Sequence, residues 1–125
     1  MKLLIVDDAS AVYRRLIELL GGIERLTALS VARSLLDMPA KCREFQPDTV
    51  VLDIDLPDGN GLGAIGIVKS ICPAARLFIF SNHVVCRDMA LAQGADGFYD
   101  KSLEFEKLVR CLIPDAPAAI PLTAH

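Results

Sequence analysis

Leu3-Leu4-Ile5-Val6-Asp7-Asp8, at residues 3–8, is an unbroken apolar run that ends in two carboxylates. Short apolar runs of this kind are typical of strands buried on both faces, as the strands of parallel sheets are. Three further runs have the same pattern: Thr49-Val50-Val51-Leu52 before Asp53, Leu77-Phe78-Ile79-Phe80 before Ser81, and Gly97-Phe98-Tyr99 before Asp100-Lys101. The sequence therefore indicates a parallel sheet with polar side chains at the ends of its strands.

Segments with helical periodicity separate these runs. The first helix is expected at about residues 10–20, ends at Gly21-Gly22, and carries an apolar stripe of Val12, Leu16, Leu19 and Leu20. Residues 26–31 alternate apolar and small polar side chains, which is typical of a half-exposed edge strand. With right-handed crossovers, this alternation predicts an α/β fold: a doubly wound, flavodoxin-like sheet of five parallel strands in the order 2-1-3-4-5, with five helices.

The remaining helices are expected at about residues 34–45, after a turn-rich loop at 56–61 and up to Cys72, and at about 84–93. A fifth helix carries the apolar residues Leu103, Leu108, Val109, Leu112 and Ile113. The Pro/Ala-rich stretch 114–125 predicts a loose tail or the start of a linker after a domain at 1–113.

Composition narrows the class of protein. A chain of 125 residues that is 53% hydrophobic forms one domain with a sheet covered on both faces. The net charge of −3, without a run of Lys or Arg, argues against nucleic-acid binding by this chain. No apolar stretch reaches the ~20 residues of a membrane span, and the N-terminus has no signal-peptide pattern, which predicts a cytoplasmic location without a membrane partner. The cysteines lack metal-ligand spacing, so we expect four reduced, mostly buried thiols at Cys42, Cys72, Cys86 and Cys111.

The polar side chains at the strand ends predict a common site. In an open parallel sheet, ligands bind beyond the carboxyl ends of the strands, near the point where the strand order reverses. Here that point lies between the first and third strands, which end in Asp7-Asp8 and Asp53. We expect these three carboxylates to converge with the Ser81 hydroxyl and the Lys101 ammonium, a set that suits a metal ion and a phosphoryl group.

These four signatures, each at a strand end and in this order, resemble the receiver domain of two-component response regulators from about Lys2 to Ile113. The resemblance implies that Asp53 is a phosphoacceptor, a carboxylate nucleophile that forms an acyl phosphate. It also implies that Asp7, Asp8, Asp53 and the backbone carbonyl of Asp55 hold Mg²⁺. Lys101 would then pair with one phosphoryl oxygen, and Ser81 would donate a hydrogen bond to another.

The resemblance further implies a switch. In receivers the hydroxyl moves toward the phosphoryl group and an aromatic side chain on the fifth strand turns inward; Ser81 and Phe98 hold these positions. The altered surface would be the fourth helix, fifth strand and fifth helix, roughly residues 84–113, which would control a downstream protein or output domain and could form a homodimer. The phosphoryl donor would be a histidine kinase or phosphotransfer protein. The chain would not be an enzyme beyond assisting its own phosphorylation and autodephosphorylation.

Four residues depart from the family pattern or modify it. Asn82 stands where receivers usually have Ala or Gly, and we hypothesise that it narrows access to the acyl phosphate. Asp55 and His83 flank the path of the attacking water and are expected to affect phosphate lifetime. Ser102 stands where many receivers have Pro, so the family pattern does not predict the backbone geometry after the fifth strand.

Other readings of these residues stay open. Asp7-Asp8 and Ser81 are also suited to cap helices, and Lys101 beside Asp100 to form a solvated pair. A receiver fold that works as an interaction module without phosphorylation is a further alternative. Asp53-Ile54-Asp55 also resembles the D-x-D opening of haloacid-dehalogenase-type phosphatases, although that motif normally closes the first strand.

Overall fold

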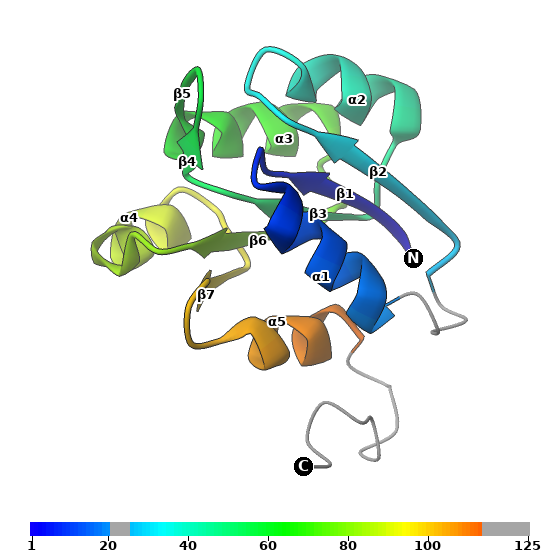
Figure 1. Cartoon of the computed structure of the whole chain (residues 1–125). Coiled ribbons are helices and arrows are strands. Elements are labelled where there is room, and N and C mark those ends of the chain that lie inside the picture. Colours follow the sequence, from blue (N-terminus) through cyan, green and yellow to red (C-terminus); the bar gives the residue numbers. More distant parts are fainter. Residues whose placement is uncertain (21–25, 114–125) are drawn as a thin grey trace.

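A parallel sheet with the strand order β2-β1-β3-β6-β7 forms the centre of this computed structural model, which describes residues 1–20 and 26–113 (Figure 1). Within these residues the sheet has five strands: β1 (Lys2–Val6), β2 (Ala28–Ala32), β3 (Thr49–Leu52), β6 (Arg76–Ser81) and β7 (Gly97–Asp100). All neighbouring pairs are parallel. Because β6 and β7 are the fourth and fifth strands of this sheet, the predicted order 2-1-3-4-5 is confirmed.

Helices cover both faces of the sheet, and over the described residues they are α1 (Ser10–Leu20), α2 (Met38–Phe45), α3 (Ile65–Ile71), α4 (Arg87–Ala92) and α5 (Phe105–Leu112). Figure 1 shows α1 and α5 together on one side of the sheet, and α2 and α3 on the other. Leu3 and Ile5 belong to the apolar cluster under α1 and α5, whereas Leu4 and Val6 belong to the cluster under α2, α3 and α4. This alternation explains why the run before Asp7 has no polar interruption.

The second strand and second helix begin later than predicted. The strand covers Ala28–Ala32, and its residues are mostly half-buried, as expected of an edge strand. The helix begins at Met38 because residues 35–37 form a turn. The N–H groups of Leu35 and Leu36 donate to the two carboxylate oxygens of Asp58 at 2.8 and 2.9 Å, which fixes this turn outside the helix.

The predicted loop at 56–61 contains a small antiparallel hairpin, β4 (Asp55–Leu56) and β5 (Gly59–Asn60), followed by the 3₁₀ turn η1 (Gly61–Ala64). The fourth helix likewise starts as a 3₁₀ turn, η2 (Val84–Cys86). The fifth helix does not include Leu103, contrary to the prediction. Leu103 lies in the turn that follows β7 and is 82% exposed, so it is not part of the core.

All four cysteines are free thiols, as predicted, but only two of the four are buried. Cys42 and Cys72 are buried, whereas Cys86 and Cys111 are partly exposed. Burial raises the pKa of the Cys42 thiol to about 11, with the neighbouring Cys72 adding to the effect.

Among residues 1–20 and 26–113, none of the helices is both long and apolar enough to cross a membrane. The predicted helix end at Gly21-Gly22 and the predicted tail at 114–125 lie outside the described residues.

Candidate functional site

The carboxyl ends of β1, β3, β6 and β7 bring the predicted site residues together. Asp7 and Asp8 follow β1, Asp53 follows β3, Ser81 ends β6, and Lys101 follows β7. A pocket of about 200 Å³ at this edge is lined by Asp8, Ala9, Asp53, Asp55, Ser81, Asn82, His83 and Lys101. The sheet topology thus places acids, a hydroxyl and an ammonium around one space, while the role of each residue stays a prediction.

Lys101 joins two carboxylates in this site. Its Nζ lies 2.7 Å from Asp7 Oδ2 and 2.9 Å from Asp53 Oδ2, and the three side chains are only 11%, 4% and 5% exposed. Burial lowers the pKa of Lys101, but the hydrogen bonds and charges of the two carboxylates outweigh burial and leave this pKa raised. Burial raises the pKa of Asp7, against the lowering effects of Lys101 and of the Ala9 N–H. Lys101 therefore stays charged and neutralises one of the two acids beside it.

A third carboxylate completes an acidic cluster. Oxygen atoms of Asp7, Asp8 and Asp53 lie within 4.8 Å of one another, with Asp7 and Asp53 buried and Asp8 exposed. Hard oxygen ligands from carboxylates, with one side open to water, are what Mg²⁺ prefers in proteins. One ammonium does not balance three carboxylates, so these residues fit a divalent cation.

Backbone hydrogen bonds past the strand ends fix the buried acids. The Asp53 N–H donates to the Val6 carbonyl at 2.9 Å, which extends the pairing of β1 and β3 by one residue. One Asp7 oxygen accepts from the Ala9 N–H at 2.8 Å, and one Asp53 oxygen accepts from the Asp55 N–H at 3.2 Å. Each carboxylate therefore keeps its second oxygen for Lys101.

Gly61 positions the backbone of Asp53, although the turn-rich loop at 56–61 did not predict this role. A Cβ atom at Gly61 would collide with the Asp53 carbonyl oxygen, and the Gly61 N–H donates to the Ile54 carbonyl at 2.6 Å. The chain can fold back over Asp53 only without a side chain here. The signal was present in the turn-rich stretch Pro57-Asp58-Gly59-Asn60-Gly61, but a turn pattern does not name the backbone that it approaches.

The two predicted switch residues are buried. Ser81 is fully buried, and its Oγ accepts a hydrogen bond from the His83 N–H at 3.1 Å. Phe98 is 4% exposed, so its ring already lies inside the molecule. Arg87, which no sequence pattern pointed to, places its guanidinium 5.1 Å from the centre of this ring and 3.2 Å from Glu104 Oε1.

The predicted modulators stand at the mouth of the pocket. His83 Nε2 lies 3.6 Å from Asp55 Oδ2, and both side chains are exposed. Asn82 Oδ1 accepts a hydrogen bond from the Ser102 hydroxyl. The Ser102 N–H in turn donates to Asp100 Oδ1 at 2.7 Å, within the turn that follows β7. The exit of β7 is thus an ordered turn with Ser102 in it.

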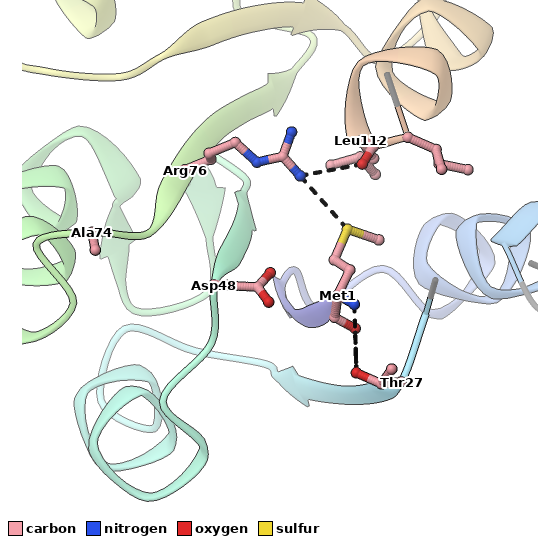
Figure 2. A pocket seen from close by; sticks show the side chains of 7 residues that line it. Met1, Thr27, Asp48, Ala74, Arg76 and Leu112 are labelled. Atoms are coloured by element: carbon pink, nitrogen blue, oxygen red, sulfur yellow. Dashed lines mark hydrogen bonds between the residues drawn. The ribbon is translucent and has the colours of Figure 1, made fainter. Parts of the chain in front are cut away.

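A larger, open pocket lies at the opposite edge of the sheet, where the strands begin (Figure 2). Arg76 Nη1 donates to the Cys111 carbonyl at 3.3 Å, and Nη2 donates to the Leu112 carbonyl at 3.2 Å and to Thr49 Oγ1 at 3.1 Å. This guanidinium therefore serves the last carbonyls of α5, a structural role.

Known proteins share both the sequence pattern and the fold. The chain is 32% identical over 114 residues to the DNA-binding transcriptional activator DevR/DosR of Mycobacterium tuberculosis, a match that covers 90% of this chain and 52% of the relative. A LuxR-family two-component response regulator from Aurantimonas sp. is 26% identical with a TM-score of 0.78, over 98% of this chain and 91% of that structure. A CheY-like receiver domain protein from Methanospirillum hungatei has a TM-score of 0.80 at 20% identity, over 90% of each chain, and shows the fold alone.

The chain spans about half the length of the curated relatives that it matches first. The family model of the response regulator receiver domain matches residues 3–113, nearly all of the described sequence. Together with the strand order and the acidic cluster, this match shows that the chain belongs to the response regulator receiver domain family of two-component systems.

Proposed function

We propose that this receiver domain is a phosphorylation-dependent signalling switch with Asp53 as its phosphoacceptor. One observation carries the proposal: the Lys101 ammonium joins Asp7 and Asp53, with Asp8 in the same acidic cluster and Ser81 in the same pocket. A carboxylate nucleophile, a compact cation and a hydroxyl donor are the groups that phosphoryl transfer to a carboxylate requires.

The donor would be a phosphohistidine of a histidine kinase or of a phosphotransfer protein. An Asp53 carboxylate oxygen attacks the phosphorus, a P–O bond forms, the P–N bond breaks, and the imidazole nitrogen leaves with the electron pair. Lys101 would move from Asp53 to a phosphoryl oxygen and Ser81 would donate to another. Mg²⁺, held by Asp7, Asp8, Asp53 and the backbone carbonyl of Asp55, would offset the charge of the phosphoryl oxygens.

The output of the switch would be the surface of α4, β7 and α5. Arg87 on α4 contacts the Phe98 ring of β7 and Glu104 at the start of α5, so a shift of Ser81 and Phe98 would be felt across all three elements. This surface would bind a downstream protein or output domain, or a second copy of the chain. Direct nucleic-acid binding is not part of the proposal.

Access and lifetime would be set at the mouth of the pocket. Asn82, His83 and Asp55 line this pocket, and the exposed His83 and Asp55 side chains lie 3.6 Å apart. We assign these three residues to the control of donor access and of acyl phosphate hydrolysis.

The domain would comprise residues 1–113, with 114–125 as a tail or the start of a linker. Since the relatives are about twice as long, the output activity of the whole protein is a separate question. The domain would be located in the cytoplasm. It would act as a phosphoacceptor and not as an enzyme.

Intact mass after incubation with acetyl phosphate and Mg²⁺ tests this function. The native chain should gain one base-labile phosphoryl group, Asp53→Ala should gain none, and the exposed Asp88→Ala should behave as the native chain does. Removing Mg²⁺ with a chelator should abolish the gain. A folded native chain that gains nothing contradicts the proposal and favours the phosphorylation-independent module. Turnover of added phosphomonoesters would favour the phosphatase.

A further inference from the structure

Asn82 and Ser102 meet beside the candidate phosphorylation pocket, each just past the end of a strand. β6 ends at Ser81, and Lys101 follows β7. The Lys101 N–H donates to the Ser81 carbonyl at 3.1 Å, which carries the pairing of the two strands one step further. The residues that follow, Asn82 and Ser102, are therefore neighbours where the two loops diverge.

The contact between them fixes the direction of the Asn82 carboxamide. The Ser102 hydroxyl donates a 2.8 Å hydrogen bond to Asn82 Oδ1, and Ser102 is itself held by Asp100. Because the oxygen and nitrogen are bonded to the same trigonal carbon and point in different directions, the NH₂ group is not directed at the Ser102 hydroxyl. Within residues 1–20 and 26–113, no group accepts a hydrogen bond from Asn82 Nδ2.

This amide belongs to the wall of the pocket that holds Asp53, Ser81 and Lys101. A phosphoryl group in transfer carries negative charge on its three equatorial oxygens. An N–H donor that is already oriented stabilises such charge without the cost of reorientation. Asn82 therefore has the chemistry of a charge-stabilising donor and not only the bulk of an obstacle.

We propose that Asn82 Nδ2 donates a hydrogen bond to a phosphoryl oxygen during transfer to Asp53, and that Ser102 is the positioning residue that orients it. This inference rests on the proposed phosphoacceptor function. If Asn82 is a hydrogen-bond donor, it raises the rate of phosphorylation. If Asn82 is only an obstacle, it lowers this rate.

Two substitutions separate the donor from the obstacle. Asn82→Leu keeps a side chain of similar shape without an N–H donor, whereas Asn82→Ala removes both bulk and donor. We expect both variants to slow Asp53 phosphorylation by saturating acetyl phosphate with Mg²⁺ by about tenfold or more, as loss of one hydrogen bond to a charged group does. Intact mass at timed intervals gives the rates. If Asn82→Ala is phosphorylated faster than the native chain and Asn82→Leu at the native rate, Asn82 only obstructs the pocket and the proposal is overturned. Native rates in both variants also overturn the proposal.

A double-mutant cycle tests Ser102. Ser102→Ala should slow phosphorylation about two- to threefold in the native background and have no effect in Asn82→Leu, because its effect passes through the amide. Ser102→Thr should keep the native rate, and the exposed Ser70→Ala is the matched control. Equal slowing by Ser102→Ala in both backgrounds overturns the positioning role.

The two proposals fail in different ways. A native chain that takes up no phosphoryl group overturns the proposed function and this inference with it. A native chain phosphorylated at Asp53, with Asn82→Leu at the native rate, overturns this inference alone. Urea unfolding of each variant establishes that a lower rate does not come from a lower folded fraction.

Discussion

The two ends of the parallel strands differ in how their charged side chains are paired. We call the end where the strands begin the amino edge of the sheet, and the end where they finish the carboxyl edge. At the edge where the strands begin, Arg76 donates to two carbonyls of α5, and Asp48 accepts from the Lys2 N–H at 3.0 Å and from the Thr49 hydroxyl at 2.9 Å. At the end where the strands finish, the Lys101 ammonium pairs with Asp7 and Asp53, and Asp8 adds a third carboxylate to the same cluster. The first set of charges has its partners within the fold, whereas the second set has an excess of negative charge that suits a ligand. Substitutions at the two edges should therefore separate stability from function.

The largest effect is expected for Lys101→Met at the carboxyl edge. Loss of the ammonium removes a charge that would stabilise the phosphoryl oxygens, and phosphorylation by acetyl phosphate should slow by about a hundredfold or more. Timed intact mass with Mg²⁺ measures the rate. Lys107→Met, which removes an exposed lysine 3.3 Å from Glu104, should keep the native rate. A Lys101→Met rate within a few-fold of native would remove Lys101 from the site.

Gly61→Ala tests whether the backbone over Asp53 is as tightly constrained as the site requires. The new methyl group would collide with the Asp53 carbonyl, so the free energy of unfolding should fall by about 3 kcal/mol and phosphorylation should slow. Gly63→Ala is the matched control, because a Cβ at Gly63 meets nothing within 4 Å. Urea unfolding of both variants measures the difference, and equal stabilities would show that the loop yields without cost.

Arg76→Ala tests the amino edge. The last two carbonyls of α5 and the Thr49 hydroxyl would each lose a hydrogen bond from Arg76. The free energy of unfolding should therefore fall by about 3 kcal/mol, at roughly 1 kcal/mol per hydrogen bond. The phosphorylation rate of the folded protein should stay native. Arg43→Ala, on the exposed face of α2, controls for the loss of a positive charge. A slower phosphorylation rate in folded Arg76→Ala would contradict the separation of the two edges.

The smallest effect concerns acid stability. Burial acts to raise the pKa of Asp96, but hydrogen bonds from the Leu77 N–H and Lys69 outweigh it and hold this pKa below its ordinary value of 3.8. The stability that Asp96 contributes is therefore complete above about pH 4. It is lost as the pH falls through the lowered pKa of the folded state. Between about pH 4 and about pH 2, Asp96→Asn should lose less stability than the native chain does, as measured by urea unfolding. Identical curves for the two proteins would contradict this.

The fold was readable from the sequence because it depends on local patterns. Four apolar runs, each closed by a polar residue, predicted β1, β3, β6 and β7. The same pattern predicted that Asp7, Asp53, Ser81 and Lys101 lie together at the carboxyl ends of these strands. What the sequence did not reveal depends on contacts between distant segments. The carboxylate of Asp58 delays the start of α2, and the guanidinium of Arg87 covers Phe98.

The finer parts of the site have the same limit. Gly61 appears in the sequence as one turn residue among several, and only the folded backbone shows that Asp53 lies against it. Ser102 and Asn82 are twenty residues apart, so no local pattern reports their hydrogen bond. Leu103 matched the apolar stripe of α5 in spacing, but the helix begins two residues later and leaves it in water.

The four cysteines differ in burial, so thiol-reactive labels should distinguish between them in the folded protein. Thiol-reactive dyes should spare Cys42 and Cys72 in the folded protein and attach to Cys86 and Cys111, which are partly exposed. Cys86 ends the 3₁₀ turn that leads into α4, while Cys111 lies in the last turn of α5, where its carbonyl accepts from Arg76. With Cys111→Ser, a single dye at Cys86 would report optically on the start of α4 during phosphorylation. The reverse variant, Cys86→Ser, would carry the dye on Cys111 and would report on α5, the other helix of the proposed output surface.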